Sequence, residues 1–445
     1  MIPNRFILLL GLLLALSGPQ SLPAASQSGD SIYRVVKDPW NTGVKPPGGS
    51  DKAEPADDRL QLAAALGKEV PLWLEDAWQE NPQDLQLGLS LLQYYHKQQD
   101  TTRTLDLAKK LYAAHPGNTE VLRALVIALL DSGNTAAALE QAGRLTQLQG
   151  NSPDAWYLLG LANIKKPDNA AAHRALDRAV ALDPTHFLPP LEAKARLYLS
   201  EQQSKEALEI ARTLKTRFPT VATGYALEGE AYAQQRQFAK AAPAFQTAFS
   251  KAPSAGLALA LANAYWQTDN QADAFKTLKS WLANNPKDMF ARTLLMTYLD
   301  SLQRDPEAIA EAETMWLQAP DNGIVLSNLA MLYQQVGDKR ALELAERAMQ
   351  LAPDSPDVAD TLGWILVQSN QLPRGLELIR QAIAQKPDDP VIAYHLAAAY
   401  AKAGQREAAL QELEIVTQLL KLAQDKPSPR LMEDVKKLQA SLQQK

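Results

Sequence analysis

Side chains that could catalyse a reaction or hold a metal are sparse in this sequence of 445 residues. The five histidines are His96, His115, His173, His186 and His395. None belongs to an H-E-x-x-H pair, and the chain has no cysteine to act as a thiolate ligand or nucleophile. The nucleophile elbow G-x-S-x-G and the phosphate loop G-x-x-x-x-G-K-[ST] are also missing. We therefore predict that the protein is not an enzyme and binds no cofactor and no metal.

The histidines have a simpler structural explanation than catalysis. His115 and His186 lie beside prolines that end helices, as exposed turn residues do. His96 and His395 fall on the first helix of an expected helical pair, where they could face a groove. A hydrolase activity that is lost when either of these two is mutated would contradict the non-enzymatic interpretation.

Composition and charge limit the partners. Hydrophobic residues make up 46% and charged residues 21% of the chain, which is enough apolar surface for a folded core. The formal net charge is −5, and it becomes −6 if Arg5 is removed with a cleaved signal. Because phosphate binding requires a basic surface, we expect no nucleic-acid partner.

The N-terminus is typical of an export signal. Arg5 provides a short positive region, and Phe6 to Gly18 form an apolar run that is short for a membrane span. Cleavage is expected near Ala24 to Ser26, so residues 1–25 are assigned to the signal peptide, with an uncleaved N-terminal anchor as the alternative. No later segment has the length and apolarity to span a bilayer. We therefore expect a periplasmic or otherwise exported protein.

Proline recurs at a fixed period through most of the chain. Residues 26–56 are rich in Gly, Pro, Ser and Asp and are predicted to form a flexible tether, followed by a partial helical unit at 57–84. The periodic prolines are Pro82, Pro116, Pro184, Pro219, Pro253, Pro286, Pro320, Pro353 and Pro387. Their successive gaps are 34, 68, 35, 34, 33, 34, 33 and 34 residues, with Gly150 where a proline is missing. A period of 34 is typical of an array of helical pairs.

One period, residues 222–253, shows why two helices are expected. Gly229 and Tyr232 fall on one side of a first helix, while Ala241 and Phe245 fall on one side of a second. The small residues let the two backbones approach, and the aromatic residues fill the remaining volume. The proline that closes the period stops the second helix.

Small residues recur at the same two positions of the repeat along the chain. The first-helix position holds Gly160, Ala195, Gly229, Ala262, Ala330, Gly363 and Ala397. The second-helix alanine is Ala138, Ala172, Ala207, Ala241, Ala274, Ala308 and Ala409. This pattern resembles the tetratricopeptide repeat (TPR) family over ten repeats, from about Leu85 to Ala423. The resemblance implies an all-α right-handed superhelical solenoid, with the TPR array at 85–423 and a polar capping helix at 424–445.

In such a solenoid the first helices line a concave groove that binds partners. The positions opposite the buried stripe predict a partner-binding groove formed by Arg123, Tyr157, Arg196, Glu230, Asn263, Trp266, Asp360, Trp364 and Tyr394. Asp300 and Gln334 lie one turn further on. Tyr157, Trp266 and Tyr394 could equally pack between neighbouring first helices, and for Trp364 this packing is the favoured interpretation.

The C-terminal third carries a second resemblance. The strings "ADTLGW" and "DDPVIAYHLAAAYAKAG" are similar to the end of TPR proteins encoded with exosortase (PEP-CTERM) and exopolysaccharide systems of Gram-negative bacteria. This resemblance implies a scaffold that assembles an envelope complex through protein–protein contacts. Direct binding of a polysaccharide or peptidoglycan strand in the groove is the alternative.

Overall fold

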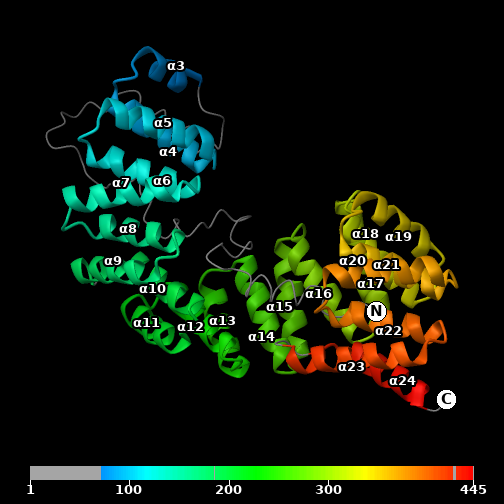
Figure 1. Ribbon diagram of the computed structural model, residues 1–445. Coiled ribbons are helices and arrows are strands. Elements are labelled where there is room, and N and C mark those ends of the chain that lie inside the picture. The colour runs from blue at the N-terminus through cyan, green and yellow to red at the C-terminus, as the bar shows by residue number, and fades with distance from the viewer. Residues whose placement is uncertain (1–71, 185, 424–426, 444–445) are drawn as a thin grey trace. The chain divides into compact units, whose positions relative to one another are not determined.

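The computed structural model describes residues 72–443 apart from residue 185 and residues 424–426 (Figure 1). The predicted signal peptide, the tether and the start of the partial helical unit lie outside the described residues. The described part of the chain forms 22 helices, α3 to α24, and no strand. It divides into two compact units, which we call the N-terminal unit (residues 72–236) and the C-terminal unit (residues 237–443).

The N-terminal unit contains ten helices. Their bounds are α3 Leu72–Glu80, α4 Leu85–Lys97, α5 Thr101–Ala114, α6 Thr119–Asp131, α7 Thr135–Leu148, α8 Pro153–Lys165, α9 Asn169–Leu182, α10 Pro189–Ser200, α11 Ser204–Arg217 and α12 Thr223–Gln234. Consecutive helices pack against each other from α3 to α12, in the order of the sequence.

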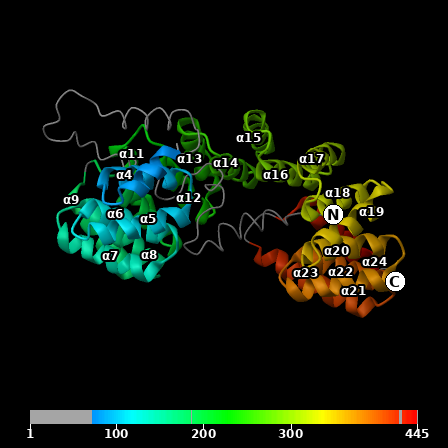
Figure 2. The same ribbon diagram turned by 90° about the horizontal axis from the view of Figure 1, so that it is seen from above.

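The C-terminal unit contains twelve helices. Their bounds are α13 Phe238–Lys251, α14 Ala255–Gln267, α15 Gln271–Asn284, α16 Met289–Ser301, α17 Asp305–Gln318, α18 Gly323–Gln335, α19 Arg340–Leu351, α20 Pro356–Gln368, α21 Leu372–Gln385, α22 Pro390–Lys402, α23 Arg406–Leu422 and α24 Pro429–Gln443. Consecutive helices again pack in sequence order, from α13 to α24 (Figure 2). The predicted all-α array of paired helices is therefore confirmed, with helical pairs from α4 and α5 to α10 and α11 in the N-terminal unit and from α14 and α15 to α22 and α23 in the C-terminal unit.

Local signals in the sequence explain where these helices begin. Asp84, Asn118, Asp288, Asn322 and Asp389 are the N-cap residues of five first helices, and their side chains accept hydrogen bonds from backbone N–H groups of the first turn. Such caps satisfy donors that have no partner within the helix. Each follows a periodic proline by two residues, so one short segment ends the second helix and starts the next first helix.

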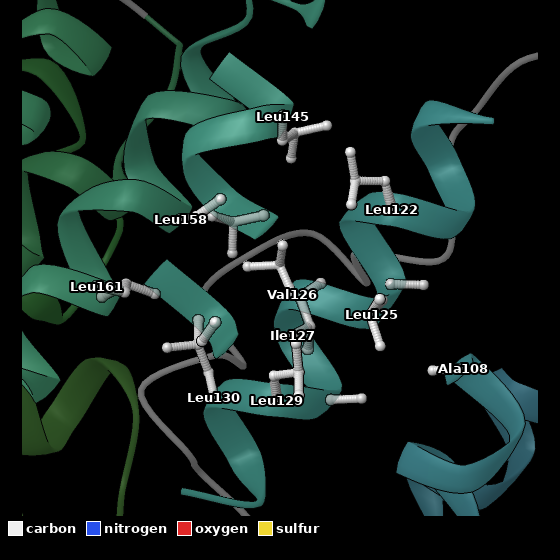
Figure 3. Close-up of a cluster of buried hydrophobic side chains, with 14 of the residues drawn as sticks. Ala108, Leu122, Leu125, Val126, Ile127, Leu129, Leu130, Leu145, Leu158 and Leu161 are labelled. Atoms are coloured by element: carbon white, nitrogen blue, oxygen red, sulfur yellow. The ribbon is translucent and has the colours of Figure 1, made fainter. Parts of the chain in front are cut away.

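The hydrophobic core follows the first helices. In α6 every residue from Val121 to Leu130 is buried except Arg123, because α5, α7 and α8 all pack against this helix. Figure 3 shows Leu122 and Val126 of α6 directed toward Leu145 of α7, with side chains of α8 alongside.

Two glycines bring α20 and α21 close together. A Cβ on Gly363 would lie 2.8 Å from the carbonyl oxygen of Gly375, and a Cβ on Gly375 would lie 2.6 Å from the carbonyl oxygen of Gly363. Alanine occupies the position of Gly375 in most other repeats. Gly375 therefore replaces the usual alanine because the backbones of α20 and α21 are in contact at Gly363.

The C-terminal helix α24 does more than cover the last repeat. It packs against α22 and α23 and also contacts α16, which lies three repeats earlier. One side of α24, formed by Arg430, Leu431, Asp434, Val435 and Leu442, is buried. The predicted C-terminal capping helix is present, and the structure adds that this helix is amphipathic and contacts α16 as well as the last repeat.

Candidate functional site

Neighbouring first helices contact one another in both units. In the N-terminal unit α6 contacts α8, α8 contacts α10, and α10 contacts α12. In the C-terminal unit α14 contacts α16, α18 contacts α20, and α20 contacts α22. We call the side of the first helices that carries the predicted groove residues the first-helix face of each unit. It holds Arg123, Tyr157, Arg196 and Glu230 in the N-terminal unit, and Asn263, Trp266, Asp300, Asp360, Trp364 and Tyr394 in the C-terminal unit.

Charged side chains connect two first helices in the N-terminal unit. Arg196 Nε donates to Glu192 Oε1 at 3.1 Å on α10, and Arg196 Nη1 donates to Glu230 Oε2 at 3.2 Å on α12. The Arg196 and Glu230 side chains keep 34% and 24% of their surface exposed. The carboxylate of Glu230, followed by that of Glu192, raises the pKa of Arg196 above its ordinary value. This ladder, Glu192–Arg196–Glu230, presents both signs of charge to the solvent.

The other two predicted residues of this unit differ in exposure. Arg123 Nη1 lies 3.7 Å from Asp154 Oδ2 of the next first helix, and burial raises the pKa of the Asp154 carboxyl. Tyr157 is 2% exposed and makes an edge-to-face contact with Phe187, with ring centroids 5.7 Å apart. Tyr157 therefore packs between repeats, which is one of the two interpretations that the sequence left open.

Trp266 and Asn263 lie next to the following first helix in the C-terminal unit. The indole of Trp266 is 5% exposed and stacks on the ring of Tyr298 of α16, with centroids 3.9 Å apart. Tyr298 Oη donates a long hydrogen bond of 3.5 Å to Asn263 Oδ1, and Gln267 Nε2 donates one of 3.4 Å to the same oxygen. Asn263 is half-buried, so its amide is the part of this group that solvent reaches.

Asp360, Trp364 and Tyr394 surround a buried histidine. His395 Nδ1 of α22 lies 2.9 Å from Asp360 Oδ2 of α20, and both side chains are fully buried. The indole of Trp364 stacks on the imidazole at 4.4 Å between centroids, with the planes 11° apart. Trp364 and Tyr394 are each 7% exposed, and burial raises the pKa of the Tyr394 hydroxyl. The favoured interpretation of Trp364 as a wedge between repeats agrees with this geometry.

The sequence did not predict the contact that α24 makes with the ends of α16 and α17. Arg430 of α24 is 6% exposed, and its Nη1 donates to Asp300 Oδ1 at 3.0 Å and to Asp305 Oδ1 at 2.7 Å. Asp300 lies in the last turn of α16 and is 2% exposed. Burial raises the pKa of its carboxyl to about 6. We call Arg430, Asp300 and Asp305 the arginine socket. The signal in the sequence was the buried stripe of residues 430–442, which has the period of an amphipathic helix.

The remaining histidines contact side chains or backbone rather than each other. His96 Nδ1 lies 3.4 Å from Asp131 Oδ2, and His173 Nε2 lies 3.0 Å from Glu201 Oε2. His115 Nε2 lies 3.1 Å from the carbonyl oxygen of Gln83. Within the described residues no group of three His, Cys, Asp or Glu side chains is arranged to hold a metal ion. None of the helices that the structure describes combines the length and apolarity needed to cross a membrane.

Comparison with known families returns one kind of repeat. Three family models described as tetratricopeptide repeat match the chain, the first at residues 95–162 and 339–390, the second at 369–440 and the third at 226–288. No curated protein matches the chain.

Solved structures with matching folds include three repeat proteins. The chain is 23% identical to MamA 41-end from Desulfovibrio magneticus RS-1, covering 38% of this chain and 97% of that one with a TM-score of 0.34. It is 17% identical to a tetratricopeptide repeat protein from Parabacteroides merdae, with 56% and 98% covered and a TM-score of 0.43. For YrrB, described as a TPR protein with an unusual peptide-binding site, the identity is 20%, the coverage 41% and 95%, and the TM-score 0.34.

Proposed function

The chain belongs to the tetratricopeptide repeat family, and from this premise we propose that it is an exported, non-enzymatic scaffold for an envelope protein complex. Tetratricopeptide repeats bind protein partners, so the general function is protein–protein interaction. The finer proposal is that the complex builds or exports an exopolysaccharide, or sorts proteins in a system linked to exosortase. It is supported by the export signal that the sequence predicts and by the resemblance of the "ADTLGW" segment near the C-terminus.

The observation that carries the proposal is the partly exposed ladder Glu192–Arg196–Glu230. A carboxylate and a guanidinium held side by side on neighbouring first helices can bind a peptide or helix that carries the opposite charges in the same order. The side chains are already held in place by each other, so little entropy is lost when a partner binds. The first-helix face of the N-terminal unit therefore suits a protein partner with both signs of charge.

Glycan binding is the less favoured function. Sugar rings bind proteins by stacking on exposed aromatic faces. On the first-helix faces the aromatic residues Tyr157, Trp266, Trp364 and Tyr394 are between 2% and 7% exposed, so none offers an open ring face in this arrangement. A glycan partner would require these repeats to open.

Site-specific photo-crosslinking in the native host tests the protein partner. A photoreactive residue replaces Glu230 in one variant and Arg212 in the other, which is exposed on the second helix α11. We expect a discrete crosslinked protein from the position of Glu230 and none from that of Arg212. In an unlabelled chain, Arg196→Ala should weaken capture of the same protein, because it removes the guanidinium that the labelled chain keeps. Equal crosslinking from both positions would contradict a partner on the first-helix face.

Two further measurements test the finer proposal. The N-terminal residue of the mature protein, determined by mass spectrometry from the periplasmic fraction, should lie near Ala24 to Ser26. Purified polysaccharide or peptidoglycan should not bind the purified chain, nor compete with the crosslinked protein. An uncleaved chain found in the cytoplasm would contradict the envelope location, and glycan binding without any protein would favour the alternative.

A further inference from the structure

The C-terminal helix occupies a surface that has the features of a helix-binding site. We propose that α24 is an internal ligand of the C-terminal unit, and that a partner helix with an arginine in its first turn binds the same surface by displacing it. This inference rests on the proposed function as a protein scaffold and specifies one of its partners. Three observations carry it: the arginine socket, the apolar stripe behind it and the way in which α24 is attached.

The arginine socket is a built polar site. Asp300 comes from the end of α16 and Asp305 from the start of α17, and Arg430 reaches both with one nitrogen. Two carboxylates around a buried guanidinium select an arginine, because a buried charge requires a charged partner with matching donors. Arg430 Nε and Asp300 Oδ2 are buried and have no hydrogen-bond partner in the structure. Asp300 therefore has acceptor capacity that α24 does not use.

The apolar stripe fits a helix. Leu431, Val435 and Leu442 of α24 belong to one buried cluster with residues of α22 and α23, among them Val391 and Leu413. Their spacing places them on one side of a helix that begins at Pro429. A partner helix needs the same order, with an arginine in the first turn followed by apolar residues on the adjacent side.

The attachment of α24 differs from that of the paired helices. Each of those packs against a partner within its pair and against the next repeat, whereas α24 follows the end of the array. The opposite side of α24 faces solvent, because it carries the exposed ion pair Glu433–Lys437 and the exposed side chain of Met432. The main polar contacts that hold it are the socket and the bond from Arg406 Nε to the carbonyl oxygen of Leu442 at 2.9 Å. A helix held along one side can leave without opening the core of the array.

A synthetic peptide of residues 427–443, labelled with a fluorophore, tests the inference on the full-length chain. The wild-type chain should bind it weakly, because its own α24 is tethered beside the site at a high effective concentration. Arg430→Glu places a third carboxylate in the socket and should release the helix. We expect this variant to bind the peptide at least about tenfold more tightly than the wild type does.

Matched controls separate the socket from general effects of mutation. Lys437→Glu changes the exposed side of α24 and should leave peptide binding as in the wild type. Adding Asp300→Asn to Arg430→Glu should weaken peptide binding again by about tenfold, because the socket loses a carboxylate. A peptide that itself carries Arg430→Glu should bind none of the chains. Circular dichroism and thermal unfolding report whether the released variant keeps its helices, and Arg430→Gln, with no added charge, should give intermediate binding.

Three results would overturn the inference. The first is equal peptide affinity of the wild type and the Arg430→Glu variant, and the second is tight binding that Asp300→Asn does not weaken. The third is a wild-type dimer that becomes a monomer with Arg430→Glu, since α24 would then lie on a second copy of the chain. The crosslink from the position of Glu230 lies in the N-terminal unit and does not depend on α24. Loss of that crosslink alone would therefore count against the proposed function and not against this inference.

Discussion

The first-helix faces of the two units differ in the burial of the pairs that join neighbouring first helices. In the N-terminal unit Arg196 pairs with Glu230, 34 residues away, and the two side chains are 34% and 24% exposed. In the C-terminal unit His395 pairs with Asp360, 35 residues away, and both side chains are fully buried. In both pairs the partners are about one repeat apart, so the length of the repeat brings side chains of neighbouring first helices together. Bulky neighbours such as Trp364 decide whether the pair is a surface for partners or part of the core.

The largest effect should come from breaking the buried pair. His395→Leu removes the imidazole that contacts the buried Asp360 carboxylate at 2.9 Å and stacks on Trp364, which should lower the local stability of α20 to α22 by about 3 kcal/mol. Arg196→Leu, at the half-exposed pair, should lower the stability of α10 to α12 by less than about 1 kcal/mol. Native-state hydrogen exchange measures both free energies of opening. Equal losses in the two units would remove the distinction between them.

The arginine socket should make stability depend on pH. Burial raises the pKa of Asp300 from 3.8 to about 6, so the folded chain holds this proton where the unfolded chain has lost it. Stability should therefore fall as pH rises from about 4 to 6, by about 3 kcal/mol in total. The difference between the wild type and Asp300→Asn in urea unfolding isolates this contribution. Asp321→Asn, at an exposed carboxylate, is the control, and an Asp300→Asn profile parallel to the wild type would contradict the prediction.

Gly375 and Gly160 differ in whether they pack against the backbone or against a side chain of the neighbouring helix. A Cβ on Gly375 would lie 2.6 Å and 2.9 Å from backbone atoms of α20, whereas a Cβ on Gly160 would meet the side chain of Leu176, with the nearest backbone atom at 3.6 Å. Gly375→Ala should therefore destabilise the chain by about 2 kcal/mol through overpacking. Gly160→Ala should change stability by no more than about 1 kcal/mol, since Leu176 can move and alanine favours the helix. Thermal unfolding of the two variants makes the comparison, and a larger loss for Gly160→Ala would contradict it.

The smallest expected difference concerns a feature that the two units share. Tyr95 Oη donates to Glu75 Oε1 at 2.5 Å, and Tyr333 Oη donates to Glu313 Oε1 at 2.5 Å, while an arginine lies over each ring. Burial, assisted by the glutamate, raises the pKa of each hydroxyl to about 12. Tyr95→Phe and Tyr333→Phe should each lower stability by about 1 kcal/mol. Hydrogen exchange in α4 and α18 should show similar losses of stability. A clear difference would mean that the two tyrosine–glutamate hydrogen bonds do not contribute equally.

The helical pairs could be predicted from the sequence because their signals are local. Prolines, capping residues and small residues at fixed spacing act within one repeat, so the pairing of helices within each unit followed directly from them. The positions of the first-helix face could be predicted for the same reason. Its exposure could not be, because the burial of Asp360 depends on His395 in the next repeat and on the stacking of Trp364. Partner binding by the nine predicted groove residues stays a prediction, and Arg196 and Glu230 are the members best placed to make such contacts.

The arginine socket could not be predicted because its partners are far apart in the sequence. Arg430 and Asp300 are separated by 130 residues, and no repeat spacing relates them. Their meeting depends on how successive first helices stack within the C-terminal unit. The sequence did contain the amphipathic stripe of α24, but a helix that caps only the last repeat and a helix that also reaches α16 have the same pattern.

The distance between α24 and the C-terminal end of α17, the helix that contributes Asp305, tests most directly whether the arginine socket holds α24 in place. Leu317 of α17 and Met432 of α24 are both exposed, and the chain has no native cysteine, so Leu317→Cys with Met432→Cys places two spin labels and no others. Pulsed electron paramagnetic resonance on the full-length chain should give one narrow distance distribution, which becomes broad and longer when Arg430→Glu is added. A broad distribution in the chain with Arg430 intact, or one that Arg430→Glu leaves unchanged, would show that the arginine socket does not hold α24 on this face.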